Sequence, residues 1–350
     1  MDFTIETLTP VNIGNGEVLS QFSDYVYEDG FIYYLGHNLL LKEISKKPNS
    51  EEIIDKFVFI VQNQAKGNLK NRFNLRDFFK EIELDYKEYA MRRIAVGTEI
   101  KEQIRLHIKS SGQPYIPGSS LKGAIRTALI SFFFKDSKEI INKKKYIGED
   151  IFGSFGRDKL KYLFVSDTPP FAEENLGIAK FYKFNIKSGE KDIPVVKEVI
   201  TGGASNSFAI KTTAQKNDVQ KKFDFLHEGN EVLLLEVIND YAKKNIEIEL
   251  QQLQRCNSDE INEIKDFYSS LLTSVEATDS KSEAYLRIGA GKTYYDNTVA
   301  QKMSKETIRL LITRNFKKAD INFFPVTRTI AVERDRKGVP GWVRISKKEA

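Results

Sequence analysis

Cysteine and histidine are scarce in this chain of 350 residues, and each shortage excludes a class of protein. The single cysteine, Cys256, excludes an internal disulfide framework and a zinc site built from several cysteines. The histidines His37, His107 and His227 lie far apart, without a His-x-x-x-His spacing or an aspartate companion. We therefore expect neither a metal centre nor another cofactor.

The chain also lacks the sequence features of membrane insertion and export. No apolar run reaches the roughly 18 residues that a membrane-spanning helix needs. Residues 1–14 begin with an acidic, alternating segment instead of the basic and then apolar order of a signal peptide. We therefore expect a cytoplasmic protein without a membrane partner.

A nucleotide-binding P-loop is absent as well, although the segment Gly289–Thr293 (GAGKT) is similar to part of one. The motif requires a glycine five residues before Gly291, where Leu286 stands, and a helix immediately afterwards. These departures exclude an NTPase. Two interpretations stay open: a loop whose amides and Lys292 contact an RNA backbone, or a hairpin turn with a solvated lysine.

The composition is that of a folded, mildly basic protein, with 41% hydrophobic and 29% charged residues. The net charge of +5 permits nucleic-acid binding without requiring it. Basic residues gather in short sets beside glycines and aromatics, where they are either contacts to a polyanion or ordinary solvated surface. These sets are Lys122/Arg126, Lys143–Lys145, Arg287/Lys292 and Arg328–Lys337.

Alternating and turn-forming residues predict several strands. Residues 2–9 alternate as a strand does, and the glycines of residues 11–16 predict a turn directly after it. Asp29-Gly30 between aromatic runs predicts a hairpin. Residues 286–293 predict a strand that runs into a glycine loop.

Helical spacing predicts an inserted layer near residues 50–91 and a helical segment at 231–275. Together these elements predict an α+β fold of two ferredoxin-like (RRM-like) domains with helical insertions. The N-terminal domain is expected to cover residues 1–160 and to carry the first insertion. The C-terminal domain is expected to cover residues 161–350 and to carry the second helical segment.

Residues 116–134 form the most informative stretch. Their apolar side chains recur at three- and four-residue spacing, which predicts an amphipathic helix after Pro117. Ser119 or Ser120 is expected to cap it by accepting hydrogen bonds from the first free amides.

Lys122 and Arg126 lie four residues apart and therefore share one flank of that helix. Gly118 and Gly123 leave room for another backbone to approach. Two cations beside a positive helix end suit a phosphate group. An ordinary capped core helix explains the same residues, so both interpretations stay open.

Two residues are candidates for chemistry on RNA. His37 would serve a metal-independent ribonuclease as general acid or base, and Asp24 would position a ribose hydroxyl for strand scission. An isolated histidine is more often a surface residue, and an aspartate before a strand is more often a turn residue. Because no second catalytic partner is visible, we expect that the chain is not an enzyme.

Several of these stretches, in the same order, resemble the CRISPR RAMP superfamily. Thr9–Gly16 is similar to its opening strand and glycine turn, and Ile116–Arg126 to its helix signature. Phe164–Asp167 and Leu286–Lys292 resemble the strand after that helix and the late glycine loop. Features that resemble the fifth Csm subunit of the type III-A (Csm) effector complex are Asp24-Tyr-Val, the Ile-Tyr-Tyr-Leu hairpin and Pro340–Val343.

The resemblance implies a non-catalytic RNA-binding subunit with two RRM-like domains, which caps the 3′ end of the crRNA in an antiviral interference complex. It also implies a role in crRNA maturation. The implied partners are the crRNA, the backbone RAMP subunit, the small helical subunit, target RNA and host maturation nucleases. The RNA-contact candidates carried over residue by residue are Gly14, Gly16, Ser119, Ser120, Lys122, Gly123, Arg126, Gly289, Gly291 and Lys292.

Two enzymatic alternatives stay open. One is a backbone RAMP subunit that cleaves target RNA through a loop aspartate, here Asp24. That subunit is shorter, whereas about 90 residues separate Asp24 from Ile116 in this chain. The other is a Cas6-like, metal-independent endoribonuclease that processes the guide and uses His37.

Overall fold

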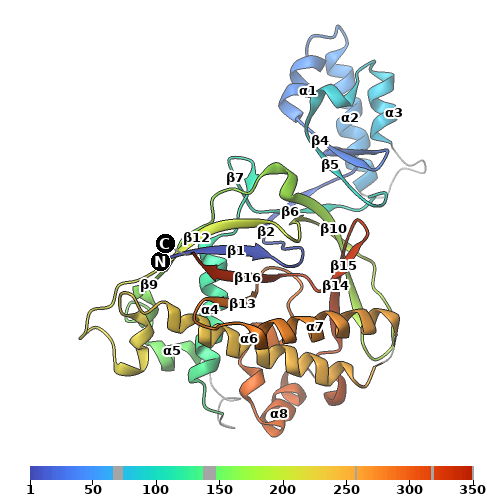
Figure 1. Cartoon of the computed structure of the whole chain (residues 1–350). Helices are drawn as coiled ribbons and strands as arrows, with labels where there is room; N and C mark the ends of the chain where they lie inside the picture. The colour runs from blue at the N-terminus through green and yellow to red at the C-terminus, as the bar shows by residue number, and fades with distance from the viewer. Residues whose placement is uncertain (66–73, 137–146, 257, 317–318, 349–350) are drawn as a thin grey trace.

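The computed structural model describes residues 1–65, 74–136, 147–256, 258–316 and 319–348. Its first large sheet has five strands in the order β13-β16-β1-β12-β9 (Figure 1). Phe3 and Ile5 of β1 are buried, whereas the residue after each of them, Thr4 and Glu6, is partly exposed. This is the predicted alternation. The strands are β1 (Asp2–Thr7), β9 (Leu163–Val165), β12 (Ser205–Thr212), β13 (Glu283–Arg287) and β16 (Trp342–Lys347).

Two helices, α4 (Gly118–Phe133) and α6 (Val232–Leu253), pack against the hydrophobic face of this sheet. The order β1, α4, β9, β12, α6, β16 is the βαββαβ order of a ferredoxin-like unit, with β13 added at the edge. The α+β, ferredoxin-like prediction is therefore confirmed. The helix predicted at 116–134 is α4, and the helical segment predicted at 231–275 is α6 followed by α7 (Asp259–Ala277).

The second large sheet has six strands in the order β15-β14-β10-β11-β6-β2. Neighbouring strands are antiparallel except β11 and β6, which are parallel. Each large sheet combines strands from both sides of residue 160, so the boundary between residues 160 and 161 stays a prediction. The strands are β2 (Gly14–Leu19), β6 (Ile104–His107), β10 (Leu176–Asn185), β11 (Val195–Ile200), β14 (Thr327–Glu333) and β15 (Arg336–Gly338).

The prediction of a turn over residues 11–16 is wrong for its second half, because Gly14 and Gly16 belong to the start of the edge strand β2. Gly14 pairs with His107 of β6, and the register then shifts before Val18. Gly16 has a φ of 92°, a conformation that glycine adopts at low cost, and it lies within this irregular part of the strand.

A separate lobe with its own hydrophobic core stands at the top of Figure 1. The predicted hairpin at Asp29-Gly30 is confirmed, and both residues have positive φ. The inserted segment is therefore larger than the expected residues 50–91, because the hairpin at Asp29-Gly30 belongs to the same lobe. The lobe consists of β3 (Tyr25–Glu28), β4 (Phe31–Leu35), α1 (His37–Ile44), α2 (Ser50–Ala65), α3 (Leu75–Glu81) and β5 (Ala90–Ala95).

The remaining elements are short, apart from the helix α8. They are β7 (Lys109–Ser110), β8 (Gln113–Pro114), α5 (Ile147–Phe152) and α8 (Lys305–Asn315). Trp342 is 1% exposed and packs in a core formed with α6 and α7, so its role is structural. Within the described ranges, no helix combines the length and apolarity needed to cross a membrane.

Candidate nucleic-acid interface

The N-terminal end of α4 is closed by the chain itself. Neither Ser119 nor Ser120 caps the helix, so that prediction is wrong; the Gly118 amide donates to Asp167 Oδ1 at 2.7 Å instead. A Cβ atom at Gly118 would lie 2.2 Å from the Val165 carbonyl oxygen. The expected close backbone approach is therefore confirmed at Gly118, and a carboxylate occupies the place where a phosphate was expected.

The two cations of α4 also have partners within the chain. Lys122 Nζ donates to the Leu163 carbonyl oxygen at 2.6 Å, and burial lowers the pKa of Lys122. Arg126 Nη2 lies 2.6 Å from Asp158 Oδ2. Gly123 is exposed, and nothing would approach a Cβ atom there within 4 Å. RNA contacts by this helix stay a prediction.

The late glycine loop requires its two glycines for packing. Gly289 and Gly291 both have positive φ. A Cβ atom at Gly289 would lie 2.3 Å from the Asn12 carbonyl oxygen, and one at Gly291 would lie 2.6 Å from Pro340 Cγ. These contacts hold the loop against the segments after β1 and before β16.

A buried ion pair fixes the shape of the same loop. Arg287 Nη1 lies 2.6 Å from Asp296 Oδ2, and each residue is only 5% exposed. Asp296 Oδ2 also accepts from the Thr293 amide at 2.8 Å, and Arg287 donates to the Gly291 carbonyl oxygen at 2.9 Å. Arg287 is therefore a structural residue, whereas Lys292 stands on the loop that it supports.

Other members of the predicted basic sets are also paired. Arg328 is 3% exposed and forms a buried ion pair with Glu249. Lys337 Nζ lies 3.1 Å from Glu263 Oε1. Lys143–Lys145 lie outside the described residues.

Across from the loop, one face of the six-stranded sheet carries a basic surface. Residues opposite each other in neighbouring strands share a face, and so do residues two apart along a strand. Lys197 of β11 pairs with Arg105 of β6, and Lys183 of β10 pairs with Thr329 of β14. Three cations from three strands are thereby placed on the face that the loop covers.

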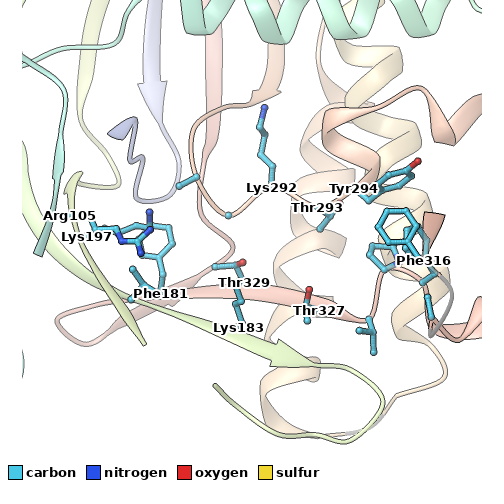
Figure 2. A pocket seen from close by; sticks show the side chains of 17 residues that line it. Arg105, Phe181, Lys183, Lys197, Lys292, Thr293, Tyr294, Phe316, Thr327 and Thr329 are labelled. Carbon is cyan, nitrogen blue, oxygen red and sulfur yellow. The ribbon is translucent and has the colours of Figure 1, made fainter. Parts of the chain in front are cut away.

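A pocket of about 670 Å³, which we call the basic groove, lies between the loop and this face (Figure 2). Of the described residues that line it, four are cations and none is a carboxylate. Arg105 and Lys197 lie at one end beside Phe181, and Tyr294 and Phe316 lie at the other. Its lining is Arg105, Phe181, Lys183, Val195, Lys197, Ala290–Tyr294, Phe316, Ala319, Phe324–Thr327 and Thr329.

Two of the four cations are partly buried. Burial lowers the pKa of Lys197, and the nearby charge of Arg105 lowers it further. Burial also lowers the pKa of Lys292, although the charge of Asp296 acts in the opposite direction. A bound anion would stabilise the charged form of both amines, so the basic groove is suited to a phosphate-bearing ligand.

The structure separates the predicted contact residues into three places. Gly291 and Lys292 line the basic groove, and Gly289 holds the loop that bears them. Gly14 and Gly16 lie on the exposed edge strand β2, beside β6. Ser119, Ser120, Lys122, Gly123 and Arg126 lie on α4 and do not line the groove.

The sequence interpretation missed three residues of the groove: Arg105, Lys183 and Lys197. A local signal was present for two of them. Lys183 alternates with Phe181 in one strand, and Lys197 alternates with Val195 in the next. Such alternation indicates that a lysine shares a face with apolar residues, although it does not indicate what lies opposite.

The expectation that the histidines lack aspartate companions is wrong. His37 Nε2 lies 3.3 Å from Asp24 Oδ1, and His227 Nδ1 lies 2.9 Å from Asp224 Oδ1. The hydrogen bond that His37 donates to the Asp24 carboxylate raises the pKa of His37. Burial alone would raise the pKa of Asp24, but hydrogen bonds from His37 and the Ser20 amide outweigh burial and lower it.

His107 is fully buried and neutral. Its Nδ1 accepts from the Ile13 amide at 3.2 Å, and its Nε2 donates to the Tyr115 carbonyl oxygen at 2.9 Å. Burial lowers the pKa of His107 to about 4. Among the residues that the structure describes, no group of three or more His, Cys, Asp or Glu side chains is placed to hold a metal ion.

A ferredoxin-like unit combined with a second sheet is an architecture that RNA-recognition proteins use. The model of the RAMP superfamily matches residues 4–294, and the chain belongs to this superfamily. The resemblance predicted from the sequence is therefore confirmed.

Curated relatives are named "CRISPR system Cms protein Csm5". The protein from Methanocaldococcus jannaschii is 26% identical, with 99% of this chain and 88% of the relative covered. The protein from Streptococcus thermophilus is 25% identical, with 60% of this chain and 63% of the relative covered.

Two solved structures share the fold at 20% sequence identity. One is a chain in a cryo-EM structure of a Csm–crRNA–target RNA ternary complex of a type III-A system. It has a TM-score of 0.68 and covers 99% of this chain and 100% of that chain. The other is the crystal structure of Csm5 from T. onnurineus, with a TM-score of 0.64 and coverage of 97% and 99%.

Proposed function

We propose that this chain is a non-catalytic, crRNA-binding subunit of a type III-A CRISPR interference complex, where it caps the 3′ end of the guide and supports its maturation in antiviral defence. Membership of the RAMP superfamily and similarity to proteins named Csm5 support this assignment. Similarity in fold to a chain of a Csm–crRNA–target RNA complex supports an RNA partner.

The observation that carries the proposal is the basic groove. Within the part of the chain that the structure describes, four cations face it and none of its lining residues is acidic. Phosphate contacts by lysine and arginine supply most of the sequence-independent affinity of proteins for nucleic acids. A guide RNA changes in sequence from one complex to the next, so contacts to its backbone suit it better than contacts to base edges.

We propose stronger and weaker RNA contacts for the residues predicted from the sequence. Lys292 and the amides of the glycine loop contact the backbone within the groove. The α4 residues form a second, weaker contact. Lys122 uses one of its three donors on Leu163, and Arg126 adds a second positive charge one helical turn further on. Gly14 and Gly16 offer an exposed edge strand next to the groove.

The proposed partners are the crRNA, the backbone RAMP subunit and the small helical subunit of the complex, with target RNA and host maturation nucleases beyond them. The copy number and RNA footprint of the purified complex test the position. One copy at the 3′ end of the guide supports the proposal. Several copies at regular spacing contradict it and favour a backbone subunit.

Charge reversal tests the groove itself. Arg105→Glu combined with Lys197→Glu is expected to weaken binding of single-stranded RNA and to flatten its salt dependence. Loss of two phosphate contacts lowers the slope of log K against log salt by about 1.4. Lys216→Glu with Lys221→Glu is the matched control, because both lysines are exposed and neither lines the groove. Equal affinity and slope for the two variants would contradict the proposal.

The Asp24–His37 pair supports a second candidate function, cleavage of RNA. His37 contacts Asp24 and the Ser23 carbonyl oxygen through Nε2. A histidine oriented by a carboxylate is suited to general acid–base catalysis. RNA products formed by the purified chain with and without EDTA, and abolished by His37→Ala or Asp24→Ala, would support an enzyme and contradict the first proposal.

A further inference from the structure

The end of the basic groove opposite Arg105 is built from three aromatic rings. The centroid of Tyr294 lies 5.0 Å from that of Phe324 and 6.0 Å from that of Phe316, in edge-to-face arrangements. The centroids of Phe316 and Phe324 are 5.1 Å apart. All three rings line the groove, and two of them are visible together in Figure 2.

These rings are not enclosed in the hydrophobic core. Phe316 is 41% exposed, and Tyr294 and Phe324 are half-buried. Exposure of a phenylalanine costs hydrophobic free energy that burial would recover. An aromatic surface held at the edge of a cationic groove is the combination that proteins use to bind single-stranded RNA, where phosphates pair with cations and bases stack on rings.

The space between the two ends suits a ribose–phosphate unit. Thr327 and Thr329 of β14 lie there, between Lys183 and the aromatic rings (Figure 2). Thr327 is exposed and Thr329 is half-buried, so both present small hydroxyl-bearing side chains to the groove. Hydroxyl groups both donate to and accept from sugar and phosphate oxygens.

We propose that the aromatic end is a nucleobase subsite, in which one unpaired base of a bound single-stranded RNA stacks on the face of Phe316 and meets Tyr294 at its edge. This inference rests on the RNA binding proposed above and specifies how one nucleotide is held. At this position, one base leaves the stack of its neighbours and contacts the protein. Among the described residues that line the aromatic end, no acidic or amide side chain is placed to read a base edge. The subsite therefore accepts any of the four bases.

An abasic scan tests the subsite. The full-length chain is titrated with a single-stranded RNA in which one nucleotide at a time lacks its base. We expect one position, or two adjacent ones, to lose about tenfold in affinity, which corresponds to about 1.4 kcal/mol. RNAs that lack a base at any other position are expected to bind almost as tightly as the intact RNA, because all phosphates are still present.

Variants of Phe316 connect that position to the ring. Phe316→Ala is expected to weaken intact RNA about tenfold, to abolish the abasic sensitivity and to leave the salt slope unchanged, because no phosphate contact is lost. Phe316→Trp restores a stacking surface and is expected to restore affinity. Its fluorescence is expected to be quenched by RNA. Phe155→Ala is the control, because that ring is fully exposed and lies outside the groove.

The outcomes separate the two proposals. RNA binding without any abasic-sensitive position overturns the subsite and leaves the proposed function intact. Indistinguishable affinities of Phe316→Ala and Phe155→Ala also overturn the subsite. If the wild-type chain binds no RNA at any salt concentration, the proposed function fails and the subsite fails with it. A changed salt slope in Phe316→Ala contradicts stacking, because it indicates that a phosphate contact was lost.

Discussion

The start of α4 and the glycine loop before Lys292 contain the same kinds of residue, yet the chain uses them differently. Both combine glycines with a lysine and an arginine. At α4 the cations and the helix end are matched to the chain's own oxygens, from Leu163, Asp158 and Asp167. At the loop, the arginine is matched internally by Asp296 and the lysine is left facing the groove. Availability for a ligand therefore depends on the nearest oxygen acceptor of the chain and not on the motif.

The largest effect is expected from the buried ion pair that supports the loop. Arg287→Ala leaves the Asp296 carboxylate buried without its partner, which costs about 3–5 kcal/mol of unfolding free energy. Denaturant titration measures this loss. Arg287→Met combined with Asp296→Leu removes both charges and is expected to recover much of it. A loss below about 1 kcal/mol for the single variant would indicate that the loop does not depend on the pair.

Alanine substitutions at the two glycines of α4 are expected to change the stability in opposite directions. Gly118→Ala places a methyl group against the Val165 backbone and is expected to destabilise by about 1–3 kcal/mol. Gly123→Ala enters open space inside the helix and is expected to stabilise by about 0.5–1 kcal/mol. Thermal unfolding of both variants checks the signs. Stabilisation by Gly118→Ala would contradict the close approach at the helix end.

The two lysines separate stability from RNA binding. Lys292→Ala is expected to lower RNA affinity several-fold and to reduce the salt slope by about 0.7, with little change in stability. Lys122→Ala is expected to lower RNA affinity less and to destabilise by about 1 kcal/mol, because a hydrogen bond to Leu163 is lost. Equal losses of affinity would remove the distinction between the two regions.

The Asp24–His37 pair of the lobe gives the smallest expected effect, because the His37 side chain is 50% exposed and solvent screens the pair. The raised pKa of His37 means that its contribution is complete below the unfolded pKa and is lost as pH rises through the folded pKa. The lowered pKa of Asp24 means that its contribution is lost as pH falls through its folded pKa.

The lobe should therefore lose less than about 1 kcal/mol between pH 5.5 and pH 8.5 through this pair. Unfolding of the wild type and of His37→Ala at several pH values measures the difference. The variant is expected to lack this pH-dependent component. A wild-type stability that rises over the same interval relative to the variant would contradict the assigned sign.

Local patterns predicted the elements that depend on local interactions. The helix at 116–134, the hairpin at Asp29-Gly30 and the helical segment at 231–275 follow from periodicity and turn chemistry. The cap of α4 was not predicted, because Asp167 lies 49 residues from the Gly118 amide that it accepts from. The glycines at 14 and 16 predict a turn locally, because their pairing with β6 cannot be read from neighbouring residues.

The candidate site was predicted only where a contiguous motif marked it. The residues of the glycine loop left both an RNA contact through Lys292 and a solvated hairpin turn open, and the resemblance favoured the RNA contact. Arg105, Lys183 and Lys197 come from three strands that are distant in sequence and meet only through the order of the sheet. The Asp24–His37 pair was missed for a different reason: the hairpin that brings its two ends together was predicted, but not the orientation of the side chains at those ends.

The pairing of β1 with β16 has a consequence for synthesis. Ile5 pairs with Ile345, and the Lys348 amide donates to the Asp2 carbonyl oxygen at 3.0 Å. A ribosome makes chains from the N-terminus, so β1 leaves the exit tunnel long before the strand that lies beside it. Contacts between such distant residues form slowly. The nascent chain therefore carries an unpaired edge of the five-stranded sheet until β16 has been made.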